Sequence, residues 1–78
     1  MTEEEYVEKA FQRLPTIEDP NDIPYVNNCL KQCYQAKFTL DDAVQFTRLT
    51  EHVDPTLDED VACRRMAEIA QKYMEPKG

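Results

Sequence analysis

The stretch that decides the fold is residues 23–38, IPYVNNCLKQCYQAKF. It holds no acidic residue and two lysines, so its local charge is +2 in a chain of 78 residues whose net charge is −7. Its apolar side chains recur at helical spacing and cover a wide face: Tyr25, Val26, Cys29, Leu30, Cys33, Tyr34 and Ala36. So wide a face on a weakly charged helix predicts a central helix, over about residues 23–37, that contacts two neighbours.

The residues just before this helix predict a loop and a helix start. Residues 15–22 read PTIEDPND, with two prolines and three acids, and only Ile17 is apolar. Asp22 is the expected N-cap. Pro24 falls in the first turn, where the missing amide of proline costs little.

Upstream of the loop, the sequence predicts a first helix over about residues 3–14. Thr2 and Glu5 have the spacing of a capping box, in which each side chain bonds a free amide at the helix start. One apolar stripe follows at the spacing i, i+1, i+4, i+5 and i+8: Tyr6, Val7, Ala10, Phe11 and Leu14. Pro15 ends the helix.

Downstream, Thr39 with Asp42 predicts the start of a third helix over about residues 40–53. Its apolar residues lie on two sides, with Leu40, Val44 and Thr47 on one side and Phe46, Leu49 and Val53 on the other. Val44 and Phe46 are about 200° apart at 100° per residue. Two interpretations stay open: the helix is buried on both sides, or one side faces a partner.

A fourth helix is expected over about residues 57–74, after the break at Asp54 and Pro55. Thr56 with Glu59 has the spacing of another capping box. The apolar stripe is Ala62, Met66, Ile69, Ala70 and Tyr73. Residues 75–78 are expected to fray. The chain is therefore predicted to be one all-α domain over residues 1–78, a compact bundle of four short, mostly antiparallel helices.

Composition excludes several classes of protein. No apolar run approaches 18 residues, so we expect no membrane span. The excess of 16 acids over 9 bases argues against nucleic-acid binding, which depends on Lys and Arg. The acidic N-terminus has no signal-peptide pattern, and three cysteines are an odd number, so we expect reduced thiols in an intracellular protein, cytoplasmic or nuclear.

The chemistry-bearing residues are few. Cys29 and Cys33 lie one helical turn apart, and a metal site would also need Cys63 and His52. We interpret the cysteines as buried small apolar residues, and His52 as complementing the end of the third helix. We expect no metal, no cofactor and no catalytic residue.

An acidic, helical chain is typical of calcium-binding EF-hand proteins, but this chain lacks the ligands that their loops need. Twelve-residue loops starting at Asp19 and at Asp54 would place Leu30 and Arg65 at position 12, which needs a bidentate glutamate. Neither loop can hold Ca²⁺.

The sequence thus favours a non-catalytic interaction or adaptor module, a small subunit of a larger intracellular complex. Its expected docking face for a partner helix or basic segment lies on the second and third helices, with Tyr25, Tyr34, Phe38, Phe46 and Leu49. Homodimerisation through the same face is an alternative use of it. A different class, a carrier of a small lipid-like ligand in a cavity between helices, is the alternative function.

Overall fold

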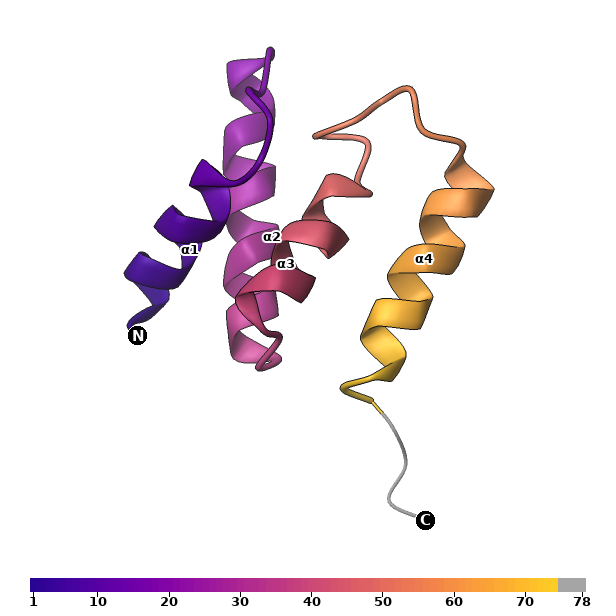
Figure 1. Cartoon of the computed structure of the whole chain (residues 1–78). Coiled ribbons are helices and arrows are strands. Elements are labelled where there is room, and N and C mark those ends of the chain that lie inside the picture. The colour runs from indigo at the N-terminus through magenta and orange to yellow at the C-terminus, as the bar shows by residue number, and fades with distance from the viewer. Residues whose placement is uncertain (75–78) are drawn as a thin grey trace.

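The computed structural model describes residues 1–74, and every regular element within them is helical. These elements are α1 (Glu3–Gln12), the 3₁₀ helix η1 (Pro20–Asp22), α2 (Ile23–Gln35), α3 (Leu40–Arg48) and α4 (Glu59–Gln71). Consecutive α-helices run in opposite directions (Figure 1). The predicted all-α bundle of four mostly antiparallel helices is confirmed. The expected fraying of residues 75–78 lies outside the described part of the chain.

Two of the predicted helix starts are confirmed by their caps. The Thr2 hydroxyl accepts the amide of Glu5 at 3.2 Å, and the Thr39 hydroxyl accepts the amide of Asp42 at the same distance. Both caps satisfy an amide that has no partner within its helix. They fix where α1 and α3 begin.

The predicted start of α4 at residue 57 is wrong. The Asp54 carboxylate accepts both the amide of Thr56 at 3.1 Å and its hydroxyl at 2.6 Å, which holds Thr56 in a turn. Asp58 becomes the N-cap and accepts the amides of Asp60 and Val61. The helix therefore begins at Glu59.

The start of α2 also differs from the prediction in its cap. Asp22 stands at the N-cap position, but its side chain makes no capping hydrogen bond. Instead, the Asp19 carboxylate caps η1 by accepting the amide of Asn21 at 2.9 Å, and η1 runs directly into α2. The Asp22 carboxylate is thereby left to bind another residue.

The third helix ends at Arg48, five residues earlier than predicted. The Thr50 hydroxyl donates to the Thr47 carbonyl at 2.7 Å, and the amides of Val53 and Asp54 both turn back to the Thr50 carbonyl. Such a side-chain bond competes with continued helix formation. His52 consequently leaves the helix axis and projects from a turn.

The second helix ends at Gln35 through a left-handed residue. Lys37 has φ of 65°, and the Phe38 amide then donates to the Cys33 carbonyl at 2.9 Å, which closes the last turn. This position favours glycine, and a side chain there costs about 1 kcal/mol. The first helix ends at Gln12, two residues earlier than predicted, yet Leu14 still packs in the core because the chain continues as a tight turn.

The core lies between α1, α2 and α3. Its buried apolar residues are Tyr6, Ala10, Leu14, Val26, Leu30, Cys33, Ala43 and Val44. The second helix contacts both α1 and α3, as its wide apolar face predicts, and Leu30 at its centre is completely buried. Residues 23–38 therefore organise the bundle.

The fourth helix lies on the outer side of α3 (Figure 1). Among the helices of residues 1–74, it contacts α3 alone. Its own buried residues, Ala62 and Ile69, do not belong to the core cluster. The first side of α3 is buried at Val44 and Thr47, whereas the second side is only partly buried: Phe46 and Val53 pack against the core and Leu49 lies beside α4.

Two tyrosines hold the connection between α2 and α3: Tyr6 of α1, and Tyr73 in the turn that follows α4, which ends at Gln71, three residues earlier than predicted. The Tyr6 hydroxyl donates to the Phe38 carbonyl at 2.9 Å, and its burial raises its pKa. The Tyr73 hydroxyl accepts the Thr39 amide at 3.1 Å and donates to the Asp42 carboxylate. The bond from Tyr73 lowers the pKa of Asp42. Residues 38–42 are thus the point where α1 and α4 meet the same segment.

Candidate functional site

The five residues predicted to bind a partner do not form one patch. Tyr25 is 60% exposed at the start of α2, where its ring stacks on His52 with centroids 4.8 Å apart. Nδ1 of His52 lies 3.0 Å from the Asp22 carboxylate. The prediction that His52 complements the end of α3 is therefore wrong, because α3 ends early and His52 reaches back to the start of α2.

Three of the five lie at the other end of α2, which is 13 residues or about 20 Å long. Phe38 packs edge-on against Phe46, with centroids 5.5 Å apart, and Tyr73 stacks on Phe38 at 4.2 Å. Tyr34 packs edge-on against Tyr6 at 5.2 Å. All three are partly buried, and the chain's own Tyr73 covers part of this aromatic cluster.

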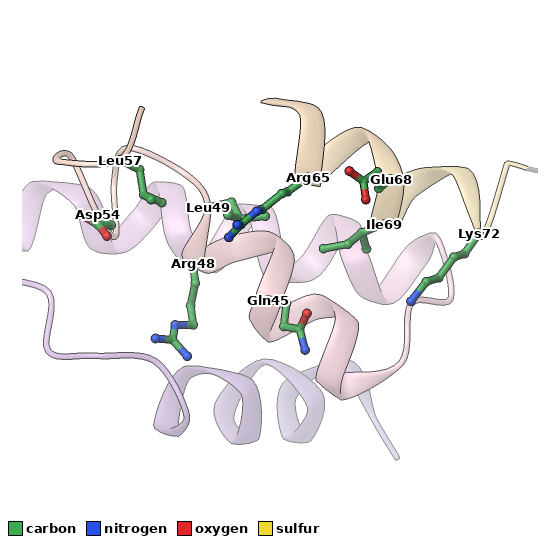
Figure 2. Close-up of a pocket in the computed structure, with 9 residues that line it drawn as sticks. All are labelled: Gln45, Arg48, Leu49, Asp54, Leu57, Arg65, Glu68, Ile69 and Lys72. Carbon is green, nitrogen blue, oxygen red and sulfur yellow. The ribbon is translucent and has the colours of Figure 1, made fainter. Parts of the chain in front are cut away.

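Leu49, the fifth, lies in a groove between α3 and α4 with a volume of about 570 Å³ (Figure 2). The groove is open to solvent, and it is lined by Gln45, Arg48, Leu49, Asp54, Leu57, Arg65, Glu68, Ile69 and Lys72. Figure 2 shows the Arg65 side chain extending toward Leu49, whereas that of Arg48 points away from α4. The cations therefore do not converge on one point, and two acids lie among them.

A second groove, which the sequence interpretation missed, runs between α1 and α2. Its volume is about 550 Å³, and it is lined by Glu3, Glu4, Val7, Glu8, Phe11, Gln12, Ile23, Asn27 and Lys31. Val7, Phe11 and Ile23 are partly buried and form an apolar floor. The charged lining residues are three glutamates and one lysine, a sum of −2. The groove combines an apolar floor with an acidic rim, on helices that α4 does not touch.

A signal for this groove exists in the sequence. The fully buried row of α1 is Tyr6 and Ala10, continued by Leu14, at a spacing of four. Val7 and Phe11 form a second row beside it, also at a spacing of four, and they stay partly exposed. This second row packs against the core with one side and keeps part of its apolar surface exposed.

The three thiols lie in three environments. Cys33 is buried in the core as predicted, Cys29 is partly buried, and Cys63 is exposed on α4, where the prediction of burial is wrong. Cys63 follows the buried Ala62 by one residue, which turns it about 100° away from α3.

The two thiols of α2 interact with each other and with α3. Sγ of Cys29 lies 3.6 Å from Oγ1 of Thr47, which is fully buried. The neighbouring thiol of Cys33 lowers the pKa of Cys29 to about 6, and Cys29 in turn raises the pKa of Cys33. Within residues 1–74, no three His, Cys, Asp or Glu side chains converge as metal ligands would.

Comparison of the chain with protein-family models, curated proteins and solved structures yields no match. Across residues 1–74, no helix has both the length and the apolar character needed to cross a membrane.

Proposed function

We propose that this chain is a non-catalytic interaction module that docks a short amphipathic helix with a basic flank in the groove between α1 and α2. The observation that carries the proposal is the pairing of a partly exposed apolar floor with a rim of glutamates. Helix-in-groove binding needs these two elements, because an apolar row gives affinity and charge complementarity selects and steers the partner.

The dimensions of the groove suit a helix of two to three turns. The α1 wall is 10 residues or about 15 Å long, and a partner helix of equal length has about ten residues. Such a partner would place apolar residues at i, i+3 or i+4, and i+7 over Val7, Phe11 and Ile23. Burial of these side chains would supply most of the binding free energy.

The charge of the rim specifies the partner's flank. Glu4 and Glu8 are exposed and one turn apart along the edge of α1, and Glu3 lies beside them. Lysines or arginines on the partner would complement this edge. The net charge of −7 on the chain would accelerate their encounter at low ionic strength.

The aromatic face of α2 and α3, which the sequence predicts as the docking site, is a weaker candidate than the groove. Phe38 already stacks on Tyr73, and Tyr25 lies at the far end of α2. The carrier alternative gains no support from the two grooves described above, because both are open to solvent.

The test uses a model peptide of about ten residues, with leucines at i, i+3 and i+7 and lysines on the flank. Binding is measured by calorimetry, and the binding face is mapped by amide chemical shifts. The double variant Glu4→Lys/Glu8→Lys should lower affinity about tenfold or more, which corresponds to about 1.4 kcal/mol.

The matched control is Glu18→Lys/Glu51→Lys, which reverses two exposed acids away from the groove and makes the same change in net charge. This control should keep affinity within about threefold. Equal losses in both double variants would reveal general electrostatic attraction and refute the groove. Chemical-shift changes confined to Phe38 and Phe46 would assign docking to the aromatic face instead.

A further inference from the structure

We propose that Cys29 and Cys33 form a two-thiol site that binds one soft, thiophilic metal ion of the Cu(I) class. The site lies on the face of α2 that packs against α3, so it is separate from the docking groove. Cys33 belongs to the core and Cys29 packs against it, whereas neither residue lines the docking groove.

The spacing of the two residues places their sulfurs within reach of one ion. Side chains four residues apart on a helix have Cβ atoms about 5–6 Å apart and share a face. Two metal–sulfur bonds of about 2.3 Å each span at most about 4.6 Å. Sγ of Cys29 lies 3.6 Å from the Thr47 hydroxyl, and Cys33 follows one turn later on the same helix. This spacing lets one ion bind both sulfurs from a single helix.

The number of ligands determines the class of ion. A tetrahedral Zn²⁺ site needs four ligands, and within the described residues no third His, Cys, Asp or Glu joins the pair. Thiolates select soft ions, and Cu(I) accepts two of them. The Thr47 hydroxyl, 3.6 Å from Cys29, adds a hydrogen-bond donor rather than a ligand.

Exposure of one thiol gives the ion a way in. Cys29 is partly exposed, while Cys33 behind it is 4% exposed. On binding, two S–H bonds are broken, two Cu–S bonds form, and two protons pass to the buffer, with no change in oxidation state. The resulting complex carries one negative charge, which a hydrogen bond donated by Thr47 would stabilise.

The experiment titrates Cu(I) anaerobically into the full chain against a colorimetric Cu(I) chelator. One equivalent should bind. Cys29→Ser and Cys33→Ala should each weaken binding about 100-fold or more, whereas Cys63→Ser, which removes the exposed thiol, should leave affinity unchanged. X-ray absorption should report two sulfur neighbours around copper.

Circular dichroism of each variant shows whether it is folded. Cys29→Ala is a second variant at Cys29, the less buried of the two positions. A folded Cys29→Ser or Cys29→Ala protein that binds Cu(I) as tightly as the parent would overturn the proposal. So would a loss of binding in Cys63→Ser. Peptide binding in the α1–α2 groove should be the same in all the cysteine variants, so failure here is distinct from failure of the docking function.

Discussion

The helices α1, α2 and α3 bury one continuous core around Leu30, whereas α4 touches only α3 among the described helices and buries Ala62 and Ile69 outside that core. Leu30 is completely buried, and Ile69 keeps 8% of its surface. The same length of helix, 13 residues in both α2 and α4, is thus held in two different ways.

Besides the buried Ala62 and Ile69, polar and aromatic contacts attach the C-terminal end of α4. There the Tyr73 ring stacks on Phe38, its hydroxyl binds Asp42, and Lys72 lies 3.4 Å from the same carboxylate. Contacts of this kind at a surface contribute less than core burial. A helix with few buried residues and such contacts can open while the rest stays folded, so we expect α4 to be a separate unit of local stability.

The largest expected effect is the loss of stability on truncating a core residue, which distinguishes the core of α1 to α3 from α4. Leu30→Ala leaves a cavity in the shared core and should cost about 2–5 kcal/mol of unfolding free energy, enough to unfold much of a domain this small. Ile69→Ala should cost less, because once α4 has detached, its lost contacts no longer affect the unfolding of α1 to α3.

Urea denaturation together with hydrogen exchange measures both changes. After Ile69→Ala, amide protection should fall in α4 and persist in α2. Equal loss of protection in all four helices would show that α4 is part of one cooperative unit with the core, and the comparison would then fail.

A smaller effect is expected when either of the two tyrosines at the connection between α2 and α3 loses its hydroxyl. Tyr6→Phe removes the donor to the Phe38 carbonyl and should lower global stability by about 1 kcal/mol. Tyr73→Phe removes the donor to Asp42 and the acceptor for the Thr39 amide, and it should raise exchange mainly in α4.

Both substitutions remove one phenolic hydroxyl from a tyrosine, so each serves as the control for the other. Exchange measured residue by residue should give two different maps. If the two exchange maps are identical, both hydroxyls stabilise the whole bundle through residues 38–42, and α4 is not a separate unit.

Much of the fold could be predicted because its determinants are local. Thr2 and Thr39 specify where helices begin, and the acid-free face of α2 predicts its central place. The start of α4 could not be predicted, since Thr56 and Asp58 are both capable caps, and Asp54 decides between them by binding Thr56. The choice depends on a side-chain contact that no spacing rule encodes.

The candidate site was harder to predict than the fold. The apolar residues on two sides of α3 are equally compatible with an external partner and with the chain's own α4. Leu49 can be covered by either one, and the sequence does not say which. Val7 and Phe11 are contiguous with Tyr6 and Ala10 on a helical wheel. Only the position of the neighbouring helix determines which of these rows is covered.

The smallest expected effect is the response of α4 to acid. The hydrogen bond from Tyr73, with help from Lys72, holds the pKa of Asp42 below its usual range. A carboxylate with a lowered pKa in the folded state contributes stability that is fully present above its unfolded pKa of about 4 and is lost as pH falls through the folded pKa. Acidification below about pH 4 should therefore loosen α4 before α2.

Asp42→Asn should remove most of this acid response, and the difference in α4 exchange protection from the parent above pH 5 should be about threefold, or about 0.6 kcal/mol. Asp41→Asn is the matched control, because Asp41 is the neighbouring acid but pairs at 2.6 Å with Arg13, the residue that follows α1. The control should keep the acid response of α4. If the Asp41 and Asp42 variants lose it equally, acid acts on α4 through the general charge of α3. The short chain of contacts from Asp42 through Tyr73 would then not be what joins α4 to the core.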